Sequence, residues 1–211
     1  MKAKAKTLLS LTFVILMFLS FTAFRLVVSE PLTFFELGQN PEATMLKYAP
    51  YLEDDTITHA PRRSLFYTDG EVVGYLTLPA LSMYERPIYY GANSINTNWQ
   101  ITTSGYSGGW DLFGDPGVAN IGAHNYQLFS NLPTLAEGDI VLVETEDGVY
   151  IYEVSGTAIY DADTDDWDEV AYRACPAGSV VLMTCWPVDA VETEDRYLVY
   201  TQLVSGTLFD L

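Results

Sequence analysis

The sequence predicts a mainly β fold, a closed antiparallel β-barrel with short helices, preceded by an N-terminal transmembrane helix. Two observations lead to this prediction. An uncharged apolar stretch of 18 residues lies near the N-terminus. From residue 71 onward, short runs rich in β-branched and aromatic residues alternate with Gly, Pro, Asn and Asp, without a long amphipathic pattern between them. The chain of 211 residues, 49 % of them apolar, can bury one core behind such an anchor.

The apolar stretch Thr7–Phe24 has the length of a membrane span, because 18 helical residues cover about 27 Å. Three lysines within the first six residues precede it, and cations at this place keep their end of the chain in the cytoplasm. We therefore expect a cytoplasmic basic tip over residues 1–6 and a signal-anchor transmembrane helix over residues 7–28. This predicts a single-pass protein of the cell membrane with an extracellular C-terminal domain. A cleaved signal peptide is the alternative, and it exports the same domain.

The charge of the chain is strongly acidic. Lys and Arg total 10 against 28 Asp and Glu, which gives a formal net charge of −18. Four of the cations precede the first acid, Glu30, so the remainder carries 6 cations against 28 acids. A protein that follows the phosphates of a nucleic acid needs a basic face. We therefore expect no nucleic-acid partner.

Residues 29–70 have the composition of an extracellular connector. Within it, Asn40-Pro41-Glu42 has the cap, proline and acid that begin a helix, which we expect over Ala43–Ala49 before Pro50.

The barrel domain is expected to span residues 71–211. Glu146-Asp147-Gly148 predicts a hairpin turn between two of its strands, because Asp-Gly suits such tight turns. Short helices are expected over Tyr126–Leu135 and Trp167–Ala174. The expected strands are Val72–Leu78, Pro87–Tyr90, Val118–Ala123, Asp139–Glu146, Val149–Tyr160, Ser179–Cys185 and Tyr197–Val204.

Side chains that could carry chemistry are few in this domain. From residue 87 to the C-terminus there is one histidine, His124, and there are two arginines, Arg173 and Arg196. Both cysteines of the chain, Cys175 and Cys185, lie in the same part. A site that needs a nucleophile, a proton carrier and a cation therefore has almost no choice of residues.

Cys185 and Arg196 are predicted to share one rim of the barrel. Cys185 ends an apolar run, and Trp186-Pro187 follows, so the strand stops there because proline cannot donate to a ladder. Arg196 opens the next strand. If the two strands pair antiparallel, the end of one lies about 5 Å from the start of the other. Each candidate residue alone also has a structural interpretation. Cys185 could be a buried, inert cysteine, Arg196 could pair with the acids before it, and His124 could be a structural histidine.

Four ordered blocks resemble the sortase family, the membrane-anchored transpeptidases of Gram-positive cell surfaces. Val181–Cys185 is similar to the Thr-Leu-x-Thr-Cys signature, with Val in its first place. Ile121–His124 resembles the histidine segment, Arg196–Val199 the arginine strand and Val73–Pro79 the first barrel strand. Asn125 stands where many relatives carry Arg, and the sortase subclass stays unresolved. The resemblance covers roughly residues 71–204.

The resemblance implies a sortase-like barrel and a thiol-dependent transpeptidase with hydrolase and acyltransferase chemistry. Such an enzyme cleaves a sorting signal of Leu-Pro-x-Thr-Gly type through a thioester, here on Cys185, and transfers the acyl group to an amine. His124 would be the proton donor and acceptor, and Arg196 would stabilise the oxyanion. The implied partners are secreted proteins with a C-terminal sorting signal and an amine acceptor from a cell-wall precursor or another surface protein.

Two other classes of function compete with this interpretation. Papain-like peptidases use the same Cys–His chemistry, but their cysteine precedes the histidine, whereas His124 precedes Cys185 here. An exported β-barrel that only binds a surface partner, without catalytic activity, stays open. Thiol reactivity distinguishes it, because a binding module has no need of a reactive, accessible Cys185.

No cofactor is expected, and calcium is the one alternative kept open. Alternate aspartates starting at Asp161 resemble a calcium-binding loop. The sixth position is Asp166 instead of Gly and the twelfth is Tyr172 instead of Glu, so the EF-hand match fails. Some sortases are stimulated by calcium through loops in this region.

The two cysteines are expected to be free thiols. A turn at Pro176–Gly178 separates Cys175 from the strand that ends at Cys185, and that strand is about 20 Å long. A disulfide needs Cα atoms within about 7 Å, so the two residues should not reach each other.

Overall fold

The computed structural model describes residues 40–61, 66–91, 99–105, 109–188, 190 and 193–210. The predicted segments 1–6 and 7–28 lie outside the described residues, and the domain boundaries drawn from them stay predictions. Among the described helices, none is both long and apolar enough to cross a membrane. Residues 41–211 form one compact unit. In the described part of this unit the helical segments are α2 (Pro41–Leu52), the short 3-10 turns η1 (Pro79–Leu81) and η4 (Leu132–Thr134), and the π-helical turn η5 (Asp168–Arg173).

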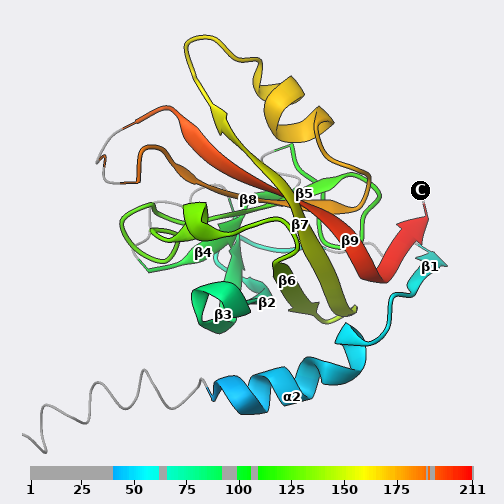
Figure 1. Ribbon diagram of the computed structural model, residues 1–211. Helices are drawn as coiled ribbons and strands as arrows, with labels where there is room; N and C mark the ends of the chain where they lie inside the picture. Colours follow the sequence, from blue (N-terminus) through cyan, green and yellow to red (C-terminus); the bar gives the residue numbers. More distant parts are fainter. Residues whose placement is uncertain are drawn as a thin grey trace, which may run out of the picture. The chain divides into compact units, whose positions relative to one another are not determined.

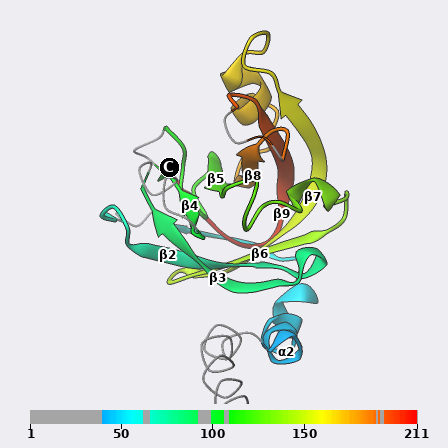
Figure 2. The same ribbon diagram turned by 90° about the vertical axis from the view of Figure 1, so that its left-hand side faces the viewer.

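Nine strands make up the sheet of this unit, and eight of them close into a barrel (Figures 1 and 2). Around the barrel the order is β9-β7-β6-β2-β3-β4-β5-β8, and β8 pairs with β9 to close the ring, while β1 joins β9 from outside. The strands are β1 (Ile57–Pro61), β2 (Val72–Leu78), β3 (Met83–Tyr90), β4 (Ile101–Thr103), β5 (Val118–Gly122), β6 (Ile140–Thr145), β7 (Gly148–Tyr160), β8 (Ser179–Cys185) and β9 (Arg196–Asp210).

The prediction of a closed, mainly β barrel is confirmed, but the prediction that it is antiparallel throughout is wrong. Within the described ring, β3–β4 and β5–β8 pair in parallel and the other neighbours pair antiparallel. Parallel neighbours need a long connection that returns the chain to the same end. The β6–β7 hairpin and the segment after it provide that return between β5 and β8.

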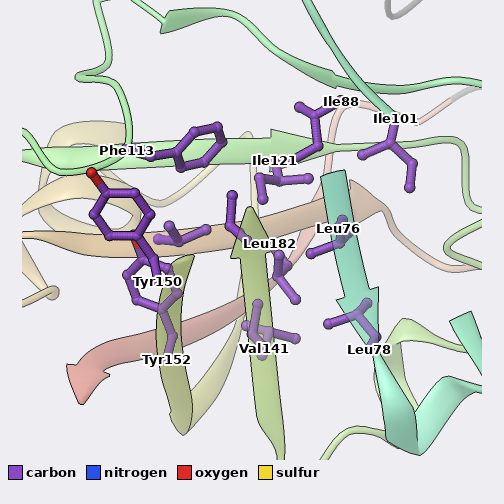
Figure 3. Close-up of a cluster of buried hydrophobic side chains, with 14 of the residues drawn as sticks. Leu76, Leu78, Ile88, Ile101, Phe113, Ile121, Val141, Tyr150, Tyr152 and Leu182 are labelled. Atoms are coloured by element: carbon purple, nitrogen blue, oxygen red, sulfur yellow. The ribbon is translucent and has the colours of Figure 1, made fainter. Parts of the chain in front are cut away.

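The interior of the barrel is filled by alternate side chains of nearly every strand (Figure 3). Strand β8 is apolar on both faces because both are covered. Val180 and Leu182 belong to the interior, whereas Val181 packs outside the barrel with Ala171 of η5 and Leu198 of β9. The connection between β7 and β8 therefore covers the outer face of β8 and β9. Fully or almost fully buried interior residues include Leu76, Leu78, Ile88, Ile101, Ile121, Val141, Tyr150, Tyr152 and Leu182.

The seven expected strands all form, and the hairpin turn joins β6 to β7 with Gly148 at a φ of +137°. Two strands were missed. β1 is an exposed strand without apolar alternation, and its pairing with β9 is set by a partner about 150 positions away. β4 has only three residues.

The helix expected over Tyr126–Leu135 is wrong: turns occupy most of the segment, and only η4 is helical. The short helix expected over Trp167–Ala174 forms as η5. The helix after Asn40 forms as α2, but it continues through Pro50 to Leu52. Pro50 has no N–H to donate to the Leu46 carbonyl, and Leu46 is itself exposed, as are Pro50, Tyr51 and Leu52 of the last turn, so water can reach this end of the helix.

Helix α2 and strand β1, which lie in the predicted connector, pack on the outside of the barrel. Tyr48 of α2 is fully buried against Leu142 and Ile151 of the barrel. Its hydroxyl donates to Glu144 Oε2 at 2.5 Å, and Lys47 Nζ lies 2.5 Å from the same carboxylate. Burial alone would raise the pKa of the Glu144 carboxyl, but the hydrogen bonds from Lys47 and Tyr48 outweigh it and lower that pKa. The ionised carboxylate therefore holds α2 to β6.

We predict that Glu144→Gln lowers the free energy of unfolding at pH 7 by about 1 to 2 kcal/mol. Because the folded-state pKa is lowered, this contribution is present above the unfolded pKa of about 4.3 and is lost as the pH falls through the folded value. Urea unfolding at pH 7 and pH 3 measures it. Glu153→Gln on β7 is the control. A deficit of the same size at both pH values would contradict the role of the ionised carboxylate.

Candidate active site

Strands β8 and β9 place Cys185 and Arg196 side by side. The antiparallel register pairs Cys185, the last residue of β8, with Arg196, the first residue of β9. Paired residues point to the same face of the sheet. The same register pairs Met183 with Leu198, and both pack outside the barrel with Val181 and Ala171, in what we call the outer cluster. The side chains of Cys185 and Arg196 therefore lie on the outer face, at the edge where the two strands meet. The predicted shared rim is confirmed.

Strand β5 brings His124 to the same edge. β5 runs parallel to β8, with Gly122 opposite Met183, so the two strands end together. The Ala123 N–H donates to the Met183 carbonyl at 3.3 Å, and the Thr184 hydroxyl donates to the Ala123 carbonyl at 2.8 Å. His124 follows directly after this locked pair. It therefore lies beside the end of β8, although it is 61 positions before Cys185 in the sequence.

A groove of about 340 Å³ joins the three residues: His124, Cys185 and Arg196 all line it. Its apolar wall includes Tyr160 at the end of β7 and Trp167 just before η5. These two rings meet edge to face with centroids 4.8 Å apart, which fixes the wall. The other residues that line the groove are Gly122, Ala123, Met183, Thr184 and Glu194.

Two neighbours hold the histidine segment in place. The ring of Tyr126 stacks on His124 with centroids 5.0 Å apart. The Asn125 side chain, 2 % exposed, donates hydrogen bonds of 3.0 Å to the carbonyls of both Pro187 and Ala190. Asn125 thus ties the residue next to the histidine to the loop that follows Cys185. Asn125, at the position where many sortases carry Arg, therefore has a structural role in this chain.

The guanidinium of Arg196 is held by backbone carbonyls. Its Nη1 donates to Thr193 at 2.9 Å and to Asp195 at 2.8 Å. It forms no ion pair with Glu194 or Asp195, so the interpretation as a partner of the preceding acids fails for these two, while Glu192 lies outside the described residues. Within the part of the chain that the structure describes, its other nitrogens make no hydrogen bond, and Arg196 lines the groove.

Both cysteines are free thiols, as predicted. Cys175 packs against the outer cluster beside η5, and burial raises the pKa of its thiol to about 11. Both thiols are half-buried, but only Cys185 lines the groove.

The described residues contain no group of three or more His, Cys, Asp or Glu side chains placed to hold a metal ion. Three acids of the segment 161–169, Asp161, Asp165 and Asp166, instead accept hydrogen bonds from backbone N–H groups of their own turns. Asp161 accepts from Asp163 at 2.9 Å, and Asp166 accepts from Asp168 at 2.9 Å and Glu169 at 3.2 Å. These carboxylates stabilise the turns of the β7–β8 connection.

Sequence reasoning missed the aromatic wall of the groove. Tyr160 and Trp167 belong to different segments, and only the closed barrel brings them beside Cys185. One signal was available: the unbroken apolar run of β8 indicates a strand covered on both faces, so some segment had to lie over its outer face.

The sequence model of the sortase domain matches residues 76–204, more than half of the chain. The chain belongs to the sortase family. Sortases are cysteine transpeptidases, and membership supports an enzyme of this kind. No curated protein matches the chain.

Solved sortase structures share the fold. The chain is similar to sortase C from Clostridium perfringens SM101, with a TM-score of 0.52 and 23 % identity over 65 % of this chain and 72 % of that one. It is also similar to the SrtA sortase from Actinomyces oris, with a TM-score of 0.55 and 19 % identity over 68 % and 86 % of the two chains. For sortase A from Listeria monocytogenes the TM-score is 0.51, with 20 % identity over 63 % and 86 %. Because classes A and C both appear, the subclass stays unresolved.

We predict that a neutral-pH thiol reagent modifies Cys185 in the folded protein and leaves Cys175 unmodified. A pKa of about 11 leaves Cys175 with roughly two orders of magnitude less thiolate than an ordinary exposed cysteine. Peptide mass spectrometry after timed labelling measures both sites, and unfolding in urea should expose Cys175. Equal labelling of the folded protein, or a bridge between the two cysteines, would contradict the assignment.

We also predict that Asn125→Ala loosens the loop after Cys185. Losing two partly buried hydrogen bonds leaves the Pro187 and Ala190 carbonyls without this donor, so amide hydrogen exchange in residues 186–195 should speed up several-fold. Asn131→Ala, which changes an exposed asparagine in the following turn, is the matched control. Unchanged exchange in residues 186–195 would show that Asn125 does not hold the loop.

Proposed function

We propose that this sortase cleaves a sorting signal of Leu-Pro-x-Thr-Gly type through a thioester on Cys185 and transfers the acyl group to an amine, anchoring proteins to the cell surface. The observation that carries the proposal is the meeting of His124, Cys185 and Arg196 in one groove. A thiol, an imidazole and a guanidinium at one edge are the groups that acyl transfer requires. The structure of a similar sortase C from Clostridium perfringens was solved with the C-terminal cell wall sorting motif, which supports this substrate class.

In the first step the Cys185 thiolate attacks the carbonyl carbon of the scissile amide. The new C–S bond forms, the C–N bond breaks, and His124 gives its proton to the departing amine. Arg196 donates hydrogen bonds to the carbonyl oxygen as negative charge develops on it, through nitrogens that its backbone partners leave free. The product is an acyl thioester on Cys185 and a neutral His124.

In the second step an amine attacks the thioester carbonyl. The C–N bond forms, His124 takes a proton from the attacking nitrogen, and the C–S bond breaks to release the thiolate. Thiolate and imidazolium are then restored. Water in place of the amine gives hydrolysis.

The proposed partners are secreted proteins with a C-terminal sorting signal and an amine acceptor from a cell-wall precursor or another surface protein. The proposed location is the cell membrane of a Gram-positive bacterium, with residues 7–28 as anchor and the barrel outside. The apolar stretch and the three lysines before it support this placement.

We predict that Cys185→Ala and His124→Ala each lower transpeptidation of a Leu-Pro-x-Thr-Gly peptide by at least about 10³-fold. Arg196→Ala should cost about 10²- to 10³-fold, as the loss of an oxyanion donor does in other enzymes. Product formation with triglycinamide measures the rates, and circular dichroism checks the fold.

The matched control for these variants is His59→Ala. His59 lies on β1, with a side chain 63 % exposed and 3.4 Å from Asp210, and it does not line the groove. This variant should keep near-normal activity. Full activity of His124→Ala together with loss of activity in His59→Ala would overturn the assignment of the histidine.

A further inference from the structure

The groove has two unlike sides. Tyr160, Trp167 and Met183 form its apolar side, beneath the β7–β8 connection. On the β8–β9 loop, Glu194 lines the same groove, and it is the one acidic side chain among the described residues that do so. Cys185 and Arg196 belong to the strand ends that this loop connects. The groove that holds Cys185 is therefore lined by both aromatic surface and a carboxylate.

Glu194 is presented by a loop that its neighbours fix. The Thr193 hydroxyl donates to the Trp186 carbonyl at 2.5 Å and accepts from the Asp195 N–H at 3.2 Å. The Asp195 carboxylate accepts from the Ala162 N–H at 3.0 Å, which ties the loop to the β7–β8 connection. These bonds hold the backbone on both sides of Glu194.

The side chain of Glu194 is exposed and lines the groove, so a solute can reach its carboxylate. It forms no hydrogen bond or ion pair with any described residue, and Arg196 bonds to backbone carbonyls instead. The fixed backbone therefore presents an accessible negative charge at the groove that holds Cys185. The group it suits is a cation with hydrogen-bond donors.

We propose that Glu194 is the subsite for the ammonium group of the amine acceptor. This inference rests on the proposed function and adds a position and a charge requirement for the second substrate. A primary amine in water at neutral pH is largely protonated, so a carboxylate beside Cys185 raises its concentration near the thioester. One proton of the bound ammonium leaves to solvent water. The second passes to His124 as the C–N bond forms and the C–S bond breaks.

The experiment compares a cationic with a neutral acceptor on the full-length protein. Triglycinamide is the cationic probe, and hydroxylamine, which is mostly uncharged at pH 7, is the neutral one. Glu194→Gln keeps the size of the side chain and removes its charge. Asp163→Asn is the matched control, because it removes one charge from an exposed position of the β7–β8 connection outside the groove.

Glu194→Gln should raise the KM for triglycinamide about five- to tenfold, the effect of losing one partly screened charge contact. The KM for the sorting peptide and the rate of hydroxamate formation should stay unchanged, and Asp163→Asn should behave as the unaltered protein. An unchanged KM for triglycinamide overturns the subsite. An equal rise with Asp163→Asn also overturns it, because the effect would then belong to the general field of the acidic surface.

A rise confined to the KM of the sorting peptide would place Glu194 against the first substrate and would equally overturn the proposal.

The proposed function would fail by a different result. If the unaltered protein forms no hydroxamate from the sorting peptide, the thioester route itself is wrong. Normal hydroxamate formation with an unchanged amine KM in Glu194→Gln contradicts the acceptor subsite alone.

Discussion

The arrangement of the candidate site depends on the pairing of β8 with two neighbours at once. Its parallel partner β5 ends where β8 ends, and its antiparallel partner β9 begins there. Three segments that are far apart in the sequence therefore meet at one edge. Side chains alternate between the faces of a strand, so a slip of one residue in the β8–β9 register would turn Cys185 and Arg196 to opposite faces. The fully buried core residues on both faces of β8 hold that register.

Stability and the site share the same connection between β7 and β8. The connection covers the outer face of β8, where Ala171 is fully buried beside Val181 and Leu198. Trp167 of the same connection contacts Trp110 of the outer cluster, with ring centroids 6.2 Å apart, and also lines the groove. The same connection therefore covers the outer face of β8 and forms the apolar side of the groove.

Local patterns predicted much of this fold, because strands and tight turns are encoded within a few neighbouring residues. The meeting of Cys185 and Arg196 could also be predicted, since adjacent antiparallel strands join their ends through one loop. His124 was expected in the site through resemblance to a family, whereas its actual placement follows from the parallel β5–β8 pair. That pairing spans some 60 residues, and no local pattern reports it. The pairing of β1 with β9 and the aromatic side of the groove also depend on contacts between segments far apart in the sequence, so no local pattern predicted them.

The central claim is that Cys185 carries the acyl group, and trapping the covalent intermediate tests it most directly. The full-length protein is mixed with a Leu-Pro-x-Thr-Gly peptide in the absence of any amine acceptor, quenched in acid and analysed by intact mass and peptide mapping. The account predicts an added mass equal to the peptide fragment that ends at the threonine, on the peptide that contains Cys185 and absent from Cys185→Ala. An adduct on Cys175, or cleavage of the peptide by Cys185→Ala at the normal rate, would contradict it.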